Sequence, residues 1–167
     1  YVNDVSEVEM LRGAGQAIGE LRRAGFRIVI CTNQSPIGRG WWDHETLAEI
    51  HDYIQDKLLA EDEDAHLDLI LYSPYAPWLG AHARKGNPGM LEAGRQLVEA
   101  AERGQQLDDE SFMDAEAYTS SDFDEASSVM VGDRSVDMEA ASAFGVRGIQ
   151  VDGALGVVDA MDSILMG

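Results

Sequence analysis

The feature that most constrains the fold is the stretch from Phe26 to Ser35, in which an almost unbroken apolar run leads directly into polar side chains. A run of this length, rich in β-branched residues and preceded by a glycine, predicts a strand buried on both faces of a sheet. Strands of this kind belong to parallel sheets, whose ligand sites lie beyond the carboxyl ends of the strands. The residues at that position, which form either an ordinary strand-to-loop junction or part of a binding site, are Thr32, Asn33, Gln34 and Ser35.

Helical patterns alternate with further short apolar runs along the rest of the chain. The runs that predict strands are residues 69–72, 128–131 and 148–151. The patterns that predict helices are residues 11–24 before Gly25, 43–58 with Asp43 as N-cap, 88–101 with Asn87 as N-cap, 138–144 before Gly145, and 157–166. This alternation predicts an α/β fold of three layers, a parallel sheet with helices on both faces. We expect residues 1–167 to form a single domain.

The formal charge of −19 at pH 7 excludes two classes of partner. Such a surface repels nucleic acid and anionic lipid, so neither a nucleic acid nor a membrane is an expected partner. The single cysteine, Cys31, excludes an intramolecular disulfide and a zinc site built from several cysteines. Because the sequence contains no recognisable signal peptide and no apolar run of membrane length, we expect a cytoplasmic protein. We also expect it to be a monomer or a weak homodimer.

Two acidic stretches are expected to lie on the surface. Residues 105–125 carry eight acidic and no basic residues, and their aromatic residues follow no period, which predicts a long acidic insertion. The spacing of an EF-hand loop is absent there, so a calcium site is not expected. The run from Glu61 to Asp64 is expected to form a solvated turn.

Three polar clusters follow predicted strands: Thr32 to Ser35, Arg84-Lys85, and Asp133 to Asp137. Hydroxyl and amide donors can hold phosphoryl oxygens, a lysine can neutralise them, and a pair of carboxylates can hold Mg²⁺. Each cluster also has an ordinary interpretation, because Lys85 alone could be a solvated surface residue and Asp137 could cap a helix. Their joint occurrence at strand ends favours a site for a phosphate ester flanked by Mg²⁺ and lysine, the arrangement that stabilises phosphoryl transfer.

The same segments resemble motifs of the haloacid dehalogenase (HAD) superfamily. The similar residues are Thr32 to Ser35, Arg84-Lys85 with the following Asn87 to Met90, and Gly132-Asp133 with Asp137. Within the superfamily they are most similar to the small-capped branch of heptose bisphosphate and histidinol-phosphate phosphatases, and the likeness covers nearly all of the chain except 105–125. The resemblance implies a Rossmann-like parallel sheet with a minimal cap and a Mg²⁺-dependent phosphatase.

The resemblance also implies a role for each site residue. Thr32, Lys85 and Asp133 would be catalytic: Thr32 would hydrogen-bond the transferring phosphoryl group, Lys85 would stabilise that group and the nucleophile, and Asp133 would bind Mg²⁺. The residues expected to bind substrate or phosphate are Asn33, Gln34, Ser35, Arg84 and Arg134. Asp137 would orient the catalytic residues without contacting the substrate.

The family's nucleophile motif, Asp-x-Asp-Gly on a central first strand, has no counterpart in this sequence. Asp4 stands alone, with neither an upstream strand nor a partner two residues on, and is not assigned the role. We therefore expect a nucleophile outside the 167 residues, and a gap in the middle of the sheet. The expected substrate is a small phosphate monoester such as heptose bisphosphate. Histidinol phosphate is the alternative substrate, and an inactive phosphate-binding module is the alternative of another class.

Two further departures concern the loop before Lys85. Relatives in this branch often bind zinc there, but here residues 72–83 contain one histidine, His82, and no cysteine, so no zinc is expected. Gly86 replaces a proline that the family usually has, and its greater backbone freedom is expected to loosen the placement of Lys85. In the preceding Gly-rich loop, Arg39 could steer an anionic substrate, whereas Trp41 and Trp42 could stack on a substrate ring or simply pack.

Overall fold

The four strands form two separate parallel pairs in the computed structural model, which describes residues 2, 4–105 and 125–167. The first pair joins β1 (Val29–Asn33) to β2 (Leu69–Ser73), with Val29 opposite Leu69. The second pair joins β3 (Val129–Gly132) to β4 (Arg147–Gln150), with Val129 opposite Arg147. The prediction of parallel pairing is confirmed. The acidic insertion expected at 105–125 lies outside the described residues except for its two ends.

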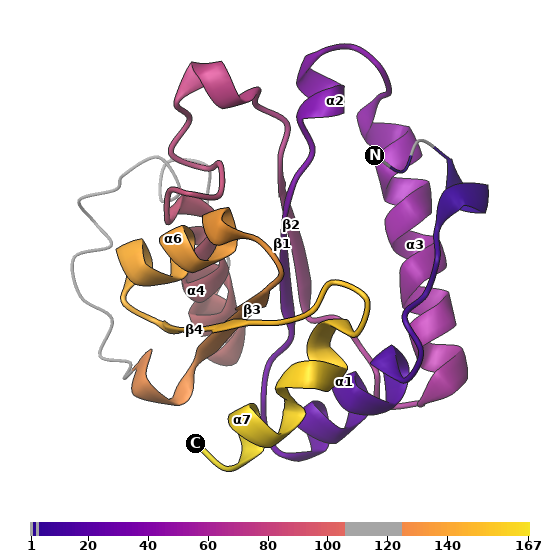
Figure 1. Cartoon of the computed structure of the whole chain (residues 1–167), viewed down its shortest axis with the longest axis vertical. Coiled ribbons are helices and arrows are strands. Elements are labelled where there is room, and N and C mark those ends of the chain that lie inside the picture. The colour runs from indigo at the N-terminus through magenta and orange to yellow at the C-terminus, as the bar shows by residue number, and fades with distance from the viewer. Residues whose placement is uncertain (1, 3, 106–124) are drawn as a thin grey trace.

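Helices lie on both sides of the strands (Figure 1). On one side, α4 packs against β1 and β2, and α6 packs against β3 and β4. On the other side, α1 contacts both α3 and the turn η4, which in turn contacts β3. The α-helices are α1 (Ala14–Arg23), α2 (Ser35–Gly38), α3 (His44–Glu61), α4 (Gly89–Glu102), α6 (Ser135–Phe144) and α7 (Met161–Leu165). The 3₁₀ turns are η1 (Val5–Glu7), η2 (Pro77–Leu79), η3 (Glu125–Ser127) and η4 (Gly156–Ala160). The predicted three-layer α/β fold is confirmed.

The buried core forms two clusters on the α1 side of the strands. One joins Ile18 of α1 to Leu58 of α3, and the other joins Leu21 of α1 to Ile164 of α7. Ile28, just before β1, packs against both clusters. These apolar contacts exclude water from the amino ends of the strands. They fix both strand pairs relative to α1.

The strands themselves are less buried than the sequence predicts. All five residues of β1 are partly exposed, and so are all four residues of β3, so the prediction of strands buried on both faces is wrong. The physical reason is that each strand has a ladder partner on one edge only, within the part of the chain that the structure describes. The outcome agrees with the expected gap in the middle of the sheet.

Several boundaries differ from those expected. β1 begins at Val29 rather than Phe26, so Thr32 and Asn33 are its last two residues rather than part of the following loop. The N-cap of α4 is Pro88, and the Asn87 side chain instead donates to the Ala81 carbonyl oxygen at 3.1 Å, so the predicted Asn87 cap is wrong. The predicted closing helix is divided into η4 and α7. No helix among the described residues is long and apolar enough to cross a membrane.

The acidic turn after α3 contacts α1 and is also exposed to solvent. The Asp62 carboxylate accepts hydrogen bonds from Arg23 at 2.9 and 3.0 Å, and these bonds lower the pKa of Asp62. The Glu61 carboxylate accepts from the Gly15 backbone N–H at 2.9 Å, which satisfies a free donor of the helix N-terminus. The prediction of a solvated turn agrees with the exposure of Glu61 and Glu63 but is wrong for Asp62, whose side chain is 14% exposed.

Replacing Gly15 by alanine is expected to destabilise the protein by about 1–3 kcal/mol, although alanine is the better helix former. An added Cβ would lie 2.6 Å from the Leu58 carbonyl oxygen and 2.5 Å from the Glu61 Cβ, so α1 and α3 would have to separate. Urea unfolding of the Gly15→Ala variant measures the change. Gln16→Ala, at an exposed position of the same helix, is the control and should shift stability by less than about 0.5 kcal/mol.

Candidate functional site

An ion pair between Lys85 and Asp137 lies at the centre of the candidate site. Lys85 Nζ is 2.7 Å from Asp137 Oδ1, and the two side chains are 16% and 3% exposed. Lys85 comes from the loop after β2, whereas Asp137 lies in the first turn of α6, after β3. Two of the three predicted clusters therefore meet at one place, and Lys85 is not an isolated surface residue.

Asn33, at the end of β1, brings the third cluster to the same place. Its Oδ1 accepts a hydrogen bond from the Lys85 backbone N–H at 2.9 Å, and its Nδ2 donates to the Lys85 carbonyl oxygen at 3.3 Å. Both sides of the amide group thus hold the backbone of one residue. Asn33 acts on Lys85 as a positioning residue in this structure, rather than offering a free amide to phosphate.

Asp137 has two structural partners, since it also caps α6. Its Oδ2 accepts a hydrogen bond from the Arg134 backbone N–H at 3.1 Å, at the start of the helix, while Oδ1 faces Lys85. Gly132 makes this placement possible, because a Cβ on residue 132 would lie 2.3 Å from the Asp137 Cβ. The helix-cap interpretation and the site interpretation of Asp137 are therefore compatible.

The remaining residues of the first cluster differ in their access to the site. Thr32 is partly exposed, and its Oγ1 accepts a hydrogen bond from Gln34 Nε2 at 3.1 Å. The backbone N–H of Gln34 donates to the Ser73 carbonyl oxygen at 2.8 Å, which joins the ends of β1 and β2. Ser35 is only 1% exposed, so the structure does not place its hydroxyl at an open edge of the site.

Arg84 directly precedes Lys85 in the sequence, and Arg134 lies three residues before Asp137. Arg84 is partly exposed, and its Nη1 donates to the Tyr75 carbonyl oxygen at 2.8 Å, which ties it to the loop after β2. Arg134 is exposed at the start of α6. Both guanidinium groups have N–H donors beyond these contacts, as a planar five-donor group does, so both can reach an anionic ligand.

Asp133 is exposed between β3 and α6 and is the carboxylate available to a cation. The loop after β4 approaches it closely, because a Cβ on Gly153 would lie 3.0 Å from Asp133 Oδ2. The described residues contain no group of three or more His, Cys, Asp or Glu side chains able to hold a metal. One carboxylate is nevertheless compatible with Mg²⁺, which commonly takes one or two protein carboxylates and fills its other positions with water and phosphate oxygens.

Neither Cys31 nor Asp4 is suited to act as the nucleophile. Cys31 precedes Thr32, and burial raises the pKa of its thiol to about 11, so almost none of it is thiolate at neutral pH. The charges of Lys85 and Asp137 have smaller and opposite effects on that pKa. Asp4 caps the turn η1, with its Oδ1 accepting from the Ser6 backbone N–H at 2.8 Å, which supports leaving it unassigned.

Gly86 anchors the loop of Lys85 instead of loosening it. Its φ of +90° lies in the left-handed region, and its backbone N–H donates to the Val136 carbonyl oxygen at 3.2 Å. Proline cannot adopt this φ, and it cannot donate this hydrogen bond because it has no backbone N–H. The expectation that Gly86 loosens Lys85 is therefore wrong, because the glycine ties the lysine loop to α6.

Replacing Gly86 by proline is expected to destabilise the protein by about 3 kcal/mol and to slow any reaction that depends on Lys85. The change removes the donor to Val136 and forces a different backbone direction next to Lys85. Thermal unfolding and steady-state kinetics of Gly86→Pro measure the two effects. Gly86→Ala is the matched control: it keeps the N–H and should lose only about 1–2 kcal/mol from the positive φ.

Sequence reasoning missed the contacts that organise the site. The Asn33–Lys85 hydrogen bonds join residues 52 positions apart, and the close approaches at Gly132 and Gly153 depend on packing between elements. The Gly132-Asp133 pair is recognisable in the sequence as part of a site. The sequence does not show that Gly132 leaves room for the Asp137 side chain. His82, the single histidine of residues 72–83, where no zinc is expected, pairs with Glu92, its Nε2 lying 2.6 Å from Glu92 Oε2.

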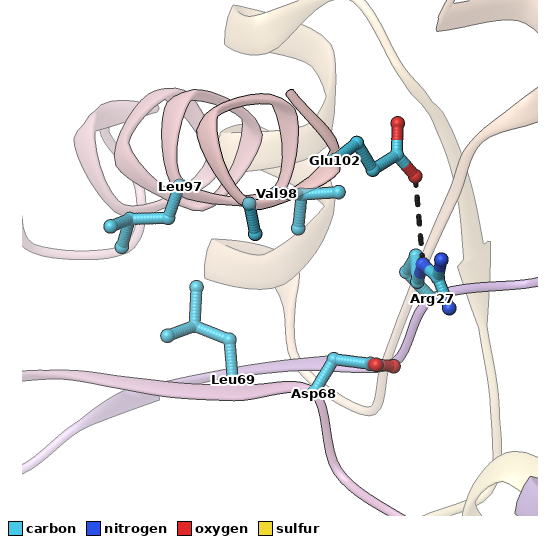
Figure 2. Close-up of a pocket in the computed structure, with 7 residues that line it drawn as sticks. Arg27, Asp68, Leu69, Leu97, Val98 and Glu102 are labelled. Carbon is cyan, nitrogen blue, oxygen red and sulfur yellow. Dashed lines mark ion pairs between the residues drawn. The ribbon is translucent and has the colours of Figure 1, made fainter. Parts of the chain in front are cut away.

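A separate hollow lies at the opposite ends of the strands, between β2 and α4 (Figure 2). It has a volume of about 380 Å³, and Arg27 and Glu102 face each other at its rim with 3.5 Å between Arg27 Nε and Glu102 Oε1. Arg27 precedes β1 and Asp68 precedes β2, so this hollow is at the amino ends of the strands. It is not part of the candidate site. Its lining residues are Arg27, Asp68, Leu69, Leu97, Val98, Ala101 and Glu102.

Known proteins are similar to this chain in sequence and in fold. A family model described as HAD-hydrolase-like matches residues 82–161. The D-glycero-beta-D-manno-heptose-1,7-bisphosphate 7-phosphatase of Escherichia coli O6:H1 is 34% identical over 149 residues, covering 87% of this chain and 67% of the relative. The phosphatase of the same name from Haemophilus ducreyi is 29% identical over 148 residues, covering 88% of this chain and 71% of the relative.

The same family appears among solved structures. The crystal structure of D,D-heptose 1.7-bisphosphate phosphatase from B. bronchiseptica, complexed with magnesium and phosphate, matches with a TM-score of 0.69 and 25% identity. The match covers 99% of this chain and 89% of that one. The resemblance noted in the sequence is thus confirmed by family model, relatives and fold. The chain belongs to the HAD-like family of phosphoric monoester hydrolases.

Proposed function

We propose that the protein is a Mg²⁺-dependent phosphatase that hydrolyses a small sugar phosphate, with heptose bisphosphate as the foremost candidate. The observation that carries the proposal is the convergence of Asn33, Lys85 and Asp137 beside Thr32 and Asp133. Donors, a lysine and a carboxylate at one end of the strands are what phosphoryl transfer requires. The names of the relatives support the choice of substrate.

Each residue has a task in this proposal. Thr32 donates to the phosphoryl group from the end of β1, while Lys85, fixed by Asn33 and Asp137, neutralises charge on its oxygens. Arg84 and Arg134 bind the rest of the ester, and Asp137 keeps Lys85 directed at the site. Asp133 would hold Mg²⁺, which supplies electrostatic stabilisation of the transferring group when it is bound.

The nucleophile in this proposal is an aspartate that is not among the 167 residues, and it forms an aspartyl-phosphate that water then hydrolyses. The single ladder edge of β1 and of β3 supports this idea, because a further strand between them would complete the sheet and bring its end to Lys85. Cys31 and Asp4 do not substitute for it, for the reasons given above.

Turnover by the full-length gene product tests the proposal. Phosphate release from D-glycero-D-manno-heptose 1,7-bisphosphate, histidinol phosphate and p-nitrophenyl phosphate would be measured with Mg²⁺ and with EDTA. We expect Mg²⁺-dependent release, with the highest kcat/KM for the heptose ester. Faster hydrolysis of histidinol phosphate would make that ester, rather than heptose bisphosphate, the proposed substrate. Mg²⁺-independent phosphate release, or no release, from all three esters would overturn the enzymatic proposal in favour of a phosphate-binding module.

A further inference from the structure

Arg39, in the loop after α2, lies over two tryptophan rings. Its guanidinium carbon lies 5.1 Å from the centre of the Trp41 ring and 4.9 Å from that of the Trp78 ring. Trp41 belongs to the same loop, whereas Trp78 lies in η2, after β2. A guanidinium stacks well on aromatic faces because it is planar and weakly hydrated. The stack thus joins two loops that come from neighbouring strands.

The edge of this guanidinium remains available to an anion. In the described part of the chain, no carboxylate lies within ion-pair distance of Arg39, and its buried Nε has no hydrogen-bond partner. Contact with the rings uses the faces of the group and not its in-plane Nη donors, which can bind a carboxylate or a phosphate in a bidentate way. In a chain of formal charge −19, an arginine without an acidic partner is a local centre of positive potential.

The rings that hold Arg39 are unusually exposed. Trp78 is 72% exposed and Trp41 60%, and the adjoining Leu79 is 60% exposed. Large exposed apolar groups gathered in one place commonly mark a binding surface. If the stack served only to pin the two loops together, packing the rings against the protein would have achieved this with less apolar area left in water.

The stack lies at the same end of the strands as Lys85. Figure 1 shows α2 and the loop containing η2 beyond the carboxyl ends of β1 and β2. The Gly38 backbone N–H donates to the Pro74 carbonyl oxygen at 3.1 Å, and Arg84, the neighbour of Lys85, donates to the Tyr75 carbonyl oxygen at 2.8 Å. α2 separates Arg39 from the end of β1 by one helical turn, a rise of about 6 Å. A small ester bound at Lys85 can span that length.

We propose that Arg39, stacked on Trp41 and Trp78, binds a second acidic group of the substrate, so that the enzyme selects phosphate esters that carry another phosphate or a carboxylate. This proposal rests on the proposed phosphatase function. Arg39 is then a specificity-determining residue, remote from the transferred phosphoryl group, and the two tryptophans keep its guanidinium directed at the substrate. Its contribution should appear chiefly in KM, since the contact exists before the chemical step.

The test compares three aryl esters on the full-length protein: phenyl phosphate, 4-carboxyphenyl phosphate and 1,4-phenylene bisphosphate. We expect the wild type to prefer one or both of the doubly acidic esters by about 10-fold in kcat/KM, which corresponds to about 1.4 kcal/mol. The ester preferred tells whether the second group is a carboxylate or a phosphate. In Arg39→Gln that preference should fall about 10-fold, mainly through KM, and Arg39→Lys should recover only part of it because lysine lacks the planar fork.

Arg27→Gln is the matched control, because it removes the same charge at the opposite ends of the strands and should leave the preference unchanged. Three results would overturn the proposal: no preference of the wild type for doubly acidic esters, an unchanged preference in Arg39→Gln, or an equal loss of kcat/KM on all three esters in Arg39→Gln. The last result would mean that the stack only supports the loops. If the wild type hydrolyses none of these aryl esters, turnover of the heptose ester still tests the proposed function, and tryptophan fluorescence decides the Arg39 proposal separately. Binding of 1,4-phenylene bisphosphate should weaken about 10-fold in Arg39→Gln, and an unchanged Kd would contradict it.

Discussion

Replacing Lys85 by methionine is expected to lower kcat by about 10²–10³-fold and to destabilise the protein by about 3 kcal/mol at pH 7. The activity falls because a fixed positive charge no longer faces the phosphoryl oxygens. The stability falls because the Asp137 carboxylate, only 3% exposed, loses its cation and stays buried. The loss lies at the low end of the range for buried ion pairs, since the Lys85 side chain is 16% exposed. Steady-state kinetics and urea unfolding measure the two effects.

A second variant separates the two effects of Lys85. In Lys85→Met/Asp137→Asn the buried charge is gone, while the asparagine Oδ1 can still accept from the Arg134 backbone N–H and cap α6. Stability should then recover most of the loss, but kcat should not. A single Lys85→Met variant as stable as the wild type would show that the pair is solvated, and a double variant that regains activity would show that Lys85 is structural only.

Replacing Asp133 by alanine is expected to remove Mg²⁺ dependence, with a loss of at least about 10²-fold in kcat, while the protein remains folded. The side chain is exposed between β3 and α6, so its removal creates no cavity and leaves no buried partner unpaired. Calorimetric titration with Mg²⁺ and phosphate release at several Mg²⁺ concentrations measure the effect. Unfolding by urea should give a change of less than about 0.5 kcal/mol.

Asp162→Ala is the control for Asp133→Ala, since it removes an exposed carboxylate from α7, away from the candidate site. It should bind Mg²⁺ and turn over substrate like the wild type. If Asp133→Ala kept its Mg²⁺ affinity and its Mg²⁺-dependent activity, the assignment of the metal to Asp133 would be wrong, even though the phosphatase function could stand.

The sequence predicted the order of elements because the signals for them are local. The apolar run before Thr32, the Asp43 cap and the glycine that ends α6 are all readable within a few residues, and the structure has all three. The three site clusters were also predictable, because polar residues at strand ends are a topological consequence of a parallel sheet. The three clusters converge because the fold class brings the carboxyl ends of the strands together, and no single residue predicts this.

The errors arise where one element contacts another. Asp62 looked solvated because its neighbours in sequence are acidic, but its partner is Arg23, 39 positions away. Gly86 looked permissive, but its N–H has a long-range acceptor in Val136. Asn87 had the composition of a helix cap, yet its amide is used by the Ala81 carbonyl. In each case tertiary hydrogen bonding outweighs a local preference.

The free edges of β1 and β3 have a consequence for how the 167 residues behave in solution. A strand edge with unpaired N–H and C=O groups is a template for pairing with another chain, and within the described residues each of the four strands has one such edge, which permits open-ended association. The formal charge of −19 opposes this by mutual repulsion, which salt screens beyond about 10 Å at 0.1 M. Colloidal stability of these residues in isolation should therefore decline as ionic strength rises, and a strand that paired with both β1 and β3 should reduce that sensitivity.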